Sequence, residues 1–93
     1  MRFEWDEVKN SVNRAKHHVS FETACRVFDD PFHRSIQDRI EGGEQRWLTI
    51  GMVESLVLLI VAHTWRDDNG DEIVRIISAR RATRQERRNY ENG

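Results

Sequence analysis

The spacing of apolar residues changes along the chain, from a helical period at the start to a strand period after Pro31. Phe3 to Trp5 predicts a short strand, and Asp6 behind it is a natural helix N-cap. A helix ending near His17 follows, because apolar residues recur at i, i+4 and i+7 (Val8, Val12 and Ala15). A polar stripe on the same helix contains Lys9, Asn13, Lys16 and His17.

A second helix is predicted from Ser20, which can act as its N-cap. Its apolar positions are Phe21, Ala24, Cys25 and Phe28. Pro31 ends this helix, because a proline disfavours helical backbone at the residue before it. The first third of the chain therefore predicts a short strand and two helices.

Four later segments have the length and composition of strands: residues 32–40, 46–53, 56–65 and 72–79. The first is mostly polar, which predicts an edge strand, and the third is the most apolar, which predicts a central strand covered on both faces. Glu41 to Glu44 predicts a turn, and Glu54-Ser55 a short break. Asn69-Gly70 predicts a hairpin, because it supplies the positive φ of a type I′ turn.

Thr83 and Glu86 form a capping box that opens a last helix to about Glu91. The predicted order is a short strand, two helices, an antiparallel meander of about four strands and a C-terminal helix. Helices grouped before such a meander predict an α+β fold, with residues 1–93 forming a single domain.

The hairpin also predicts where two arginines lie. With a two-residue loop, the directly opposed pairs are Arg66–Ile73, Thr64–Arg75 and Ala62–Ile77. Arg66 and Arg75 then share one face of the sheet as diagonal neighbours, with their Cα atoms roughly 7–8 Å apart. A three-residue loop would separate them, because a slip of one residue reverses the faces.

Positive charge is concentrated near the end of the chain. From Arg75 to Arg88 there are six arginines and one acid, which gives +5 in a chain of net charge −1. Such a cluster is a candidate phosphate site, because a guanidinium binds phosphate through two hydrogen bonds. Arg75 stands among isoleucine and valine and needs a partner. An internal carboxylate such as Glu54 and a substrate phosphate are equally compatible with the sequence.

Composition excludes several function classes. The longest apolar run, residues 56–62, is far shorter than the ~20 residues of a membrane helix, and no signal peptide is expected. Cys25 is the only cysteine, so no intrachain disulfide is expected, which fits a cytoplasmic protein. The four histidines lack metal-ligand spacing, so we expect no metal and no cofactor. The near-neutral charge disfavours non-specific nucleic-acid binding as the main task.

A set of short motifs occurs in order along nearly the whole chain. They are F-E-W-D (3–6), N-x-x-K-H (13–17), V-S-F-E (19–22), F-D-D-P (28–31), G-E-x-R (43–46), Gly51, I-x-R-I-I-S-A-R-R-A-T-x-x-E-R (73–87) and Tyr90. This set resembles the BrnT family of toxins from bacterial type II toxin–antitoxin modules. His18 departs from the pattern, since glycine commonly follows K-H in the family, and this affects a helix-end turn.

The resemblance implies a RelE-like fold and an endoribonuclease that cleaves RNA and inhibits translation. It also implies neutralisation by a ribbon-helix-helix antitoxin, BrnA, with a toxin–antitoxin heterotetramer as the expected assembly. A metal-free ribonuclease typically uses the 2′-hydroxyl of RNA as nucleophile. It then needs a base, an acid and positive groups around the reacting phosphate.

Arg66 and Arg75 are the first candidates for phosphate contact, with salt bridges on the sheet surface as the alternative. Lys16 and His17 are candidates for proton transfer. They are equally suited to complementing the dipole of their helix.

Arg80 and Arg81 are candidates for phosphate binding, and equally for a solvated strand–helix junction or an ion pair with Glu86. Tyr90 either stacks on a base or anchors the last helix. His63 is expected to line the core.

Two other functions stay compatible with the sequence. One is a non-catalytic module whose arginines hold an antitoxin or a nucleic acid. The other is a degraded toxin that acts only as a partner in transcriptional repression.

Overall fold

The computed structural model describes residues 1–54 and 56–93. Its elements, in chain order, are β1 (Arg2–Glu4), α1 (Glu7–His17), α2 (Phe21–Ala24), the 3-10 helix η1 (Cys25–Asp29), β2 (Arg34–Glu41), β3 (Glu44–Val53), β4 (Val57–Asp68), β5 (Asp71–Arg81) and α3 (Arg84–Glu91). This order agrees with the prediction. The sequence predicts a short break at Glu54-Ser55, after β3. Glu54 has a φ of 57°, and Ser55 lies outside the described residues.

The strands form one five-stranded sheet in the order β1-β5-β4-β3-β2. Strands β2 to β5 pair antiparallel with their neighbours, as predicted for the meander. The short strand predicted at the N-terminus adds a fifth strand to the four of the meander, because β1 joins the sheet parallel to β5 and pairs Glu4 with Arg75. The fold is α+β, and its sheet is mixed.

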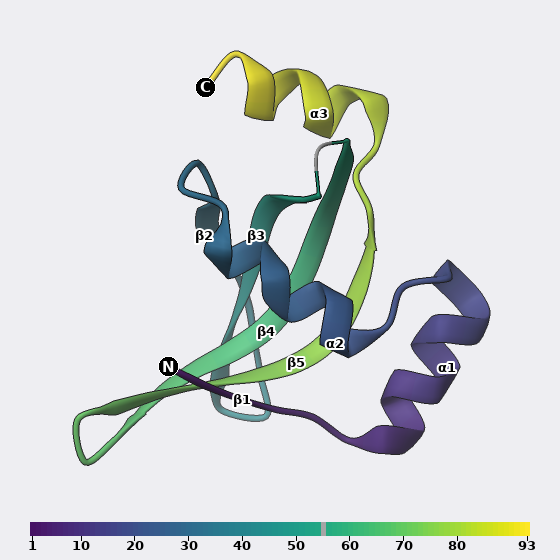
Figure 1. The fold of residues 1–93 in the computed structure, drawn as a ribbon. Coiled ribbons are helices and arrows are strands. Elements are labelled where there is room, and N and C mark those ends of the chain that lie inside the picture. Colours follow the sequence, from purple (N-terminus) through teal and green to yellow (C-terminus); the bar gives the residue numbers. More distant parts are fainter. Residues whose placement is uncertain (55) are drawn as a thin grey trace.

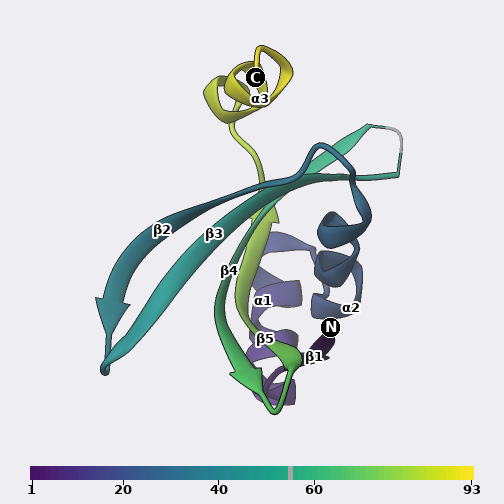
Figure 2. The same ribbon diagram turned by 90° about the vertical axis from the view of Figure 1, so that its left-hand side faces the viewer.

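Helices α1, α2 and η1 cover one face of the sheet, which we call the helix face (Figure 1). Its core is apolar and includes Phe21, Val27, Leu59, Val61 and Ile76. Figure 2 shows the β2–β3 hairpin curving away from these helices, while α3 lies near one end of the sheet. The other side of the sheet, which we call the opposite face, carries the alternate residues of β3, β4 and β5.

Helix α1 begins at the predicted cap, because Asp6 Oδ1 accepts hydrogen bonds from the backbone of Val8 and Lys9. Its buried side chains, however, are Asn10 and Asn13, whereas Val8 and Val12 are 72% and 60% exposed. The predicted apolar stripe is therefore not the packed face of α1.

Hydrogen bonds explain why asparagine is buried there. Asn13 Nδ2 donates to the carbonyls of Val19 (2.9 Å) and Ala79 (2.8 Å), and Asn13 Oδ1 accepts from the Ala79 N–H (3.1 Å). Asn10 Oδ1 accepts from the Phe21 N–H (2.9 Å). These contacts satisfy backbone groups that would otherwise be buried unpaired between α1 and β5.

The β4–β5 hairpin has the predicted two-residue loop, in which Asn69 and Gly70 have φ of 54° and 86°. The predicted pairs Arg66–Ile73 and Thr64–Arg75 are confirmed. The predicted pair Ala62–Ile77 is wrong. The register shifts between Ala62 and His63, and Ala62 pairs with Ser78. Such a bulge places one extra residue on one strand. The later residues of β5 therefore point to the face opposite to the one that simple alternation predicts.

Helix α3 has the predicted capping box, with Glu86 N–H donating to Thr83 Oγ1 and Thr83 N–H donating to Glu86 Oε1. No residue of α3 is buried. Polar contacts attach it to the rest of the molecule: Tyr90 Oη donates to Asp30 Oδ2 (2.5 Å), and Arg34 Nη2 donates to the Asn89 carbonyl (2.8 Å). Tyr90 therefore anchors the last helix.

We expect Asn13→Ala to lower the free energy of unfolding by about 2–4 kcal/mol, because it leaves three backbone groups without partners in a buried site. The matched control is Val12→Ala on the same helix, which should change stability by less than about 0.5 kcal/mol. Urea unfolding followed by circular dichroism measures both. Equal losses for the two variants would contradict this account of α1.

Candidate functional site

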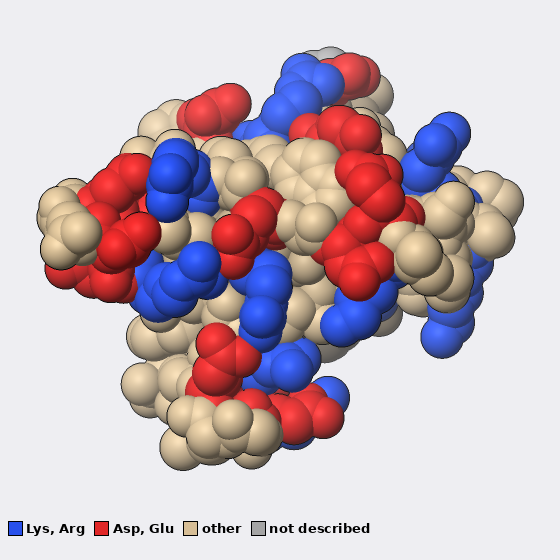
Figure 3. Space-filling model, turned by 90° about the horizontal axis from the view of Figure 1, so that it is seen from below, with Lys and Arg blue, Asp and Glu red and all other residues tan. Residues whose placement is uncertain are grey.

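Charged side chains of both signs are interleaved on the surface at the end of the sheet that carries the Asn69-Gly70 turn, which we call the hairpin end. Figure 3 shows lysine and arginine alternating with aspartate and glutamate on this side of the molecule. The arginines there are consequently held by acidic partners and do not form a continuous basic patch.

A row of polar residues crosses the opposite face from β1 to β3. Glu4 pairs with Arg75, and Arg75 pairs with Thr64. Trp47 on β3 pairs with His63 on β4. The next residue on each strand in the direction of the Asn69-Gly70 turn is Arg46 on β3 and Thr64 on β4. Directly paired residues share a face of a sheet, so this row brings together side chains from four strands.

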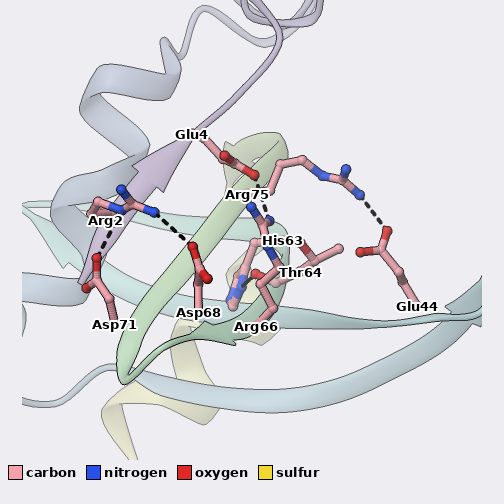
Figure 4. Close-up of polar contacts among 9 residues, drawn as sticks. All are labelled: Arg2, Glu4, Glu44, His63, Thr64, Arg66, Asp68, Asp71 and Arg75. Atoms are coloured by element: carbon pink, nitrogen blue, oxygen red, sulfur yellow. Dashed lines mark hydrogen bonds and ion pairs between the residues drawn. The ribbon is translucent and has the colours of Figure 1, made fainter.

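Arg66 and Arg75 lie on this face as predicted, and each is held by a carboxylate (Figure 4). Arg66 Nη1 is 2.7 Å from Glu4 Oε1, and Arg75 Nη2 is 2.6 Å from Glu44 Oε1. The proposed partner Glu54 is wrong, because Glu54 binds Arg26 (3.3 Å). The partner of Arg75 is Glu44, which lies on the same face of the sheet, on β3, two strands away from β5.

The two ion pairs behave as one electrostatic cluster. The hydrogen bond from Arg66 holds the pKa of Glu4 below its ordinary value, and the charge of Arg75 adds to this. The hydrogen bond to Glu4 raises the pKa of Arg66, and the charge of Glu44 contributes as well. All four side chains are between 40% and 45% exposed, so solvent and ligands reach them.

Arg80 and Tyr90 lie farther along the opposite face. Arg80 pairs with Ile60 on β4, and its guanidinium forms two hydrogen bonds with Glu86 (2.8 and 3.0 Å). The alternative ion pair with Glu86 is thus confirmed. Tyr90 lines a groove of about 290 Å³ between α3 and the apolar side chains Ile36, Leu48, Ile50 and Ile60.

Asp30 fixes the position of Tyr90. Burial alone would raise the pKa of Asp30, but hydrogen bonds from Tyr90, Met52 and Phe32 outweigh it and hold this pKa below its ordinary value. Burial, followed by the hydrogen bond to Asp30, raises the pKa of Tyr90 to about 12. The phenol therefore stays protonated and donates to a carboxylate.

Arg81, Lys16 and His17 are not brought to Arg66 and Arg75. Arg81 pairs with the core residue Leu59, which puts it on the helix face. There it lines a pocket of about 480 Å³ together with Arg14 and His18. Lys16 and His17 end α1, which packs on the same side.

His63 is fully buried on the helix face, as expected, and burial lowers its pKa. Its Nε2 lies 2.7 Å from Thr49 Oγ1. This histidine is part of the core and does not face the arginine cluster.

Sequence reasoning missed Glu4, Glu44 and Arg46 as members of the site. Glu44 and Arg46 belong to the G-E-x-R motif and Glu4 to F-E-W-D, so the signal was present in the motifs. Among residues 1–54 and 56–93, no three His, Cys, Asp or Glu side chains are arranged to hold a metal ion. No helix within the same residues is long and apolar enough to cross a membrane.

Comparison with known proteins identifies the family. Residues 5–86 match the family model of the ribonuclease toxin BrnT of type II toxin–antitoxin systems. The chain belongs to the BrnT family. The resemblance seen in the ordered motifs is thereby confirmed.

The fold is similar to that of a solved BrnT. The crystal structure of the Brucella abortus ribonuclease toxin BrnT superposes with a TM-score of 0.64, at 26% sequence identity, over 90% of this chain and 99% of the other. No curated protein matches this chain. As a member of the BrnT family it is a ribonuclease toxin of a type II toxin–antitoxin system, whose partner is an antitoxin and whose target is RNA.

We expect the Glu86 carboxylate to stabilise the protein in a pH-dependent way. The hydrogen bonds from Arg80, followed by the one from the Thr83 N–H, lower the pKa of Glu86 to about 2. A folded-state pKa below the unfolded value means that the stabilisation is present above about pH 4.5 and is lost as the pH falls toward 2.

Thermal unfolding of Glu86→Gln checks this expectation. The variant should melt below wild type at pH 7, and the difference should shrink steadily between about pH 4.5 and pH 2. Glu91→Gln is the control on the same helix, because its carboxylate is 57% exposed and 3.8 Å from Arg87. A difference that persists unchanged at pH 2 would refute the assignment.

Proposed function

We propose that this protein is a metal-independent endoribonuclease that cleaves RNA by attack of the 2′-hydroxyl on the adjacent phosphate. Arg66 and Arg75 bind that phosphate and stabilise the charge that develops on it in the transition state. Membership of a ribonuclease toxin family supports the reaction class, and the arginine pair on the opposite face supports the position.

The observation that carries the proposal is the placement of two half-exposed guanidinium groups as diagonal neighbours on rigid strands. Exposed ion pairs such as those with Glu4 and Glu44 are typically worth only ~0.2–1 kcal/mol. A phosphate that accepts two hydrogen bonds from each guanidinium can therefore replace the carboxylates. In the free protein, the same carboxylates keep the two arginines in place and limit their mutual repulsion.

Glu4 and Glu44 also supply proton acceptors within hydrogen-bond distance of the guanidinium groups. The hydrogen bond from Arg66 lowers the pKa of Glu4 in the free protein, and this bond is lost when the phosphate takes the place of Glu4. The released carboxylate can then accept a proton from a 2′-hydroxyl. We propose these two carboxylates as candidates for the general base.

The RNA runs along the opposite face from the arginine pair toward α3 in this proposal. Arg75 and Arg80 are five residues apart on β5, or about 16 Å, which is room for several nucleotides. Arg80 and the Tyr90 ring then contact RNA beyond the scissile phosphate. The predicted phosphate binding by Arg81 and proton transfer by Lys16 and His17 stay predictions. The position of these residues on the helix face suits a second contact with RNA better than a role at the phosphate held by Arg75.

We also propose the finer properties implied by the family resemblance. These are a RelE-like fold, inhibition of translation through RNA cleavage, a cytoplasmic location, and neutralisation by a BrnA-like ribbon-helix-helix antitoxin in a heterotetramer. The family match supports an antitoxin partner. Light scattering of the co-purified pair measures the stoichiometry.

We expect purified protein to cleave RNA in EDTA, and Arg66→Ala or Arg75→Ala to slow cleavage about 100-fold or more, since removing one group that stabilises a developing charge typically costs that much. Arg26→Ala is the matched control. It also removes a half-exposed arginine from an ion pair, but from η1, outside the row on the opposite face. Its cleavage rate should equal that of wild type.

Cleavage that persists unchanged in both arginine variants, at similar stability, would rule out the phosphate assignment. A non-catalytic module that acts in transcriptional repression is the alternative. It predicts no cleavage with or without ribosomes, together with tight binding of the antitoxin.

A further inference from the structure

Two polar atoms on the opposite face are buried and make no hydrogen bond within the described part of the chain: Thr64 Oγ1 and Arg46 Nε. Thr64 is 2% exposed, and the Arg46 side chain is 20% exposed. Nearly all buried polar groups in native proteins have a partner, and the exceptions require a specific explanation such as strain, catalysis or a bound polar atom.

Both atoms belong to the row that contains the candidate site. Thr64 is the direct cross-strand neighbour of Arg75, and Arg66 follows two residues later on the same face of β4. Arg46 occupies the next strand, β3, where alternation places it on the same face as Leu48 and Ile50. The two unpaired groups therefore lie on adjacent strands beside the arginine pair.

The fold itself does not use the Thr64 hydroxyl. Thr49, on the helix face, is the contrasting case, because its hydroxyl contacts both His63 Nε2 and Ser35 Oγ at 2.7 Å. At position 64, valine would have the same shape and strand preference without burying an unpaired hydroxyl. A threonine there is explained if something other than the protein accepts its hydrogen bond.

We propose that Thr64 Oγ1 and Arg46 Nε together bind one non-bridging oxygen of the RNA phosphate held by Arg66 and Arg75. This assignment rests on the ribonuclease function proposed above. Both groups can donate a hydrogen bond, and a phosphate oxygen accepts more than one. The negative charge of the phosphate makes each of these bonds stronger than a bond between neutral groups.

The local charges balance in the free protein and become positive where a phosphate displaces a carboxylate. Three arginines (46, 66 and 75) lie on the same face as Thr64, on its own strand and the two neighbouring strands. Their acidic partners are Glu41, Glu4 and Glu44. The Arg46–Glu41 contact is long, at 3.6 Å, and Arg46 Nε takes no part in it. In this proposal the phosphate reaches Thr64 beside Arg75, its direct cross-strand neighbour, whose side chain is half-exposed and can release Glu44.

Thr64→Val is the direct test, with RNA cleavage and urea unfolding measured on the same preparations. We expect cleavage to slow about 10- to 100-fold, the effect of one hydrogen bond to a charged group. Stability should be equal to or higher than that of wild type, because no bond within the protein is lost. Thr64→Ser keeps the hydroxyl and should cleave within about threefold of wild type.

Thr49→Val is the matched control, and we expect it to show the reverse pattern. Its hydroxyl is bonded within the protein, so the variant should lose stability while the folded fraction cleaves RNA at the wild-type rate. Affinity for an RNA that is 2′-O-methylated throughout, and so cannot be cleaved, should fall in Thr64→Val and Arg46→Lys but not in Thr49→Val.

The outcomes separate this inference from the proposed function. If Arg75→Ala abolishes cleavage and Thr64→Val cleaves and binds RNA like wild type, the hydroxyl contacts water only and the inference is overturned. If Thr64→Val loses stability in parallel with cleavage, the hydroxyl is structural and the inference is again overturned. If wild type does not cleave RNA at all, the proposed function fails, and the affinity for methylated RNA still decides whether Thr64 contacts a phosphate.

Discussion

The register of the β4–β5 hairpin is the constraint on which the candidate site depends. The two-residue loop at Asn69 and Gly70 fixes which residues of the two strands oppose one another. It places Arg75 opposite Thr64, and it leaves Val74 and Ile76 to pack on the helix face. One residue more in this turn would send the Arg75 guanidinium into the apolar core and two branched aliphatic side chains to the surface. The burial that stabilises the fold therefore also holds the arginines in position.

The bulge between Ala62 and His63 is the second constraint, because it decides which way the arginines at the end of β5 point. Without it, Arg80 would lie on the helix face and Arg81 on the opposite face. With it, Ala79 reaches Asn13 through two hydrogen bonds, and Arg80 reaches Glu86 across the junction with α3. The extra residue thus allows the end of β5 to bond to α1 through Ala79 and to α3 through Arg80.

Local chemistry allowed much of this structure to be predicted from the sequence. The caps at Asp6, Ser20 and Thr83, the hairpin at Asn69-Gly70 and the shared face of Arg66 and Arg75 each depend on residues close together in the chain. The ordered motifs indicated the family.

The remaining features depend on long-range contacts. Asn13 is buried because its amide bonds Ala79, 66 positions away, and no periodicity within α1 contains that information. The acidic partners of Arg66 and Arg75 were missed for the same reason, since Glu4 on β1 and Glu44 on β3 are 62 and 31 positions away from them.

Helix α3 has no buried residue and is joined to the body by hydrogen bonds and ion pairs at Asp30, Arg34 and Arg80. A segment of this kind opens with a smaller free energy than a strand at the centre of a sheet. Its amide protons should therefore exchange with solvent through local opening, while those of β4 and β5 require global unfolding. Each opening of α3 would expose the apolar groove beneath Tyr90 and leave the polar row at the hairpin end intact.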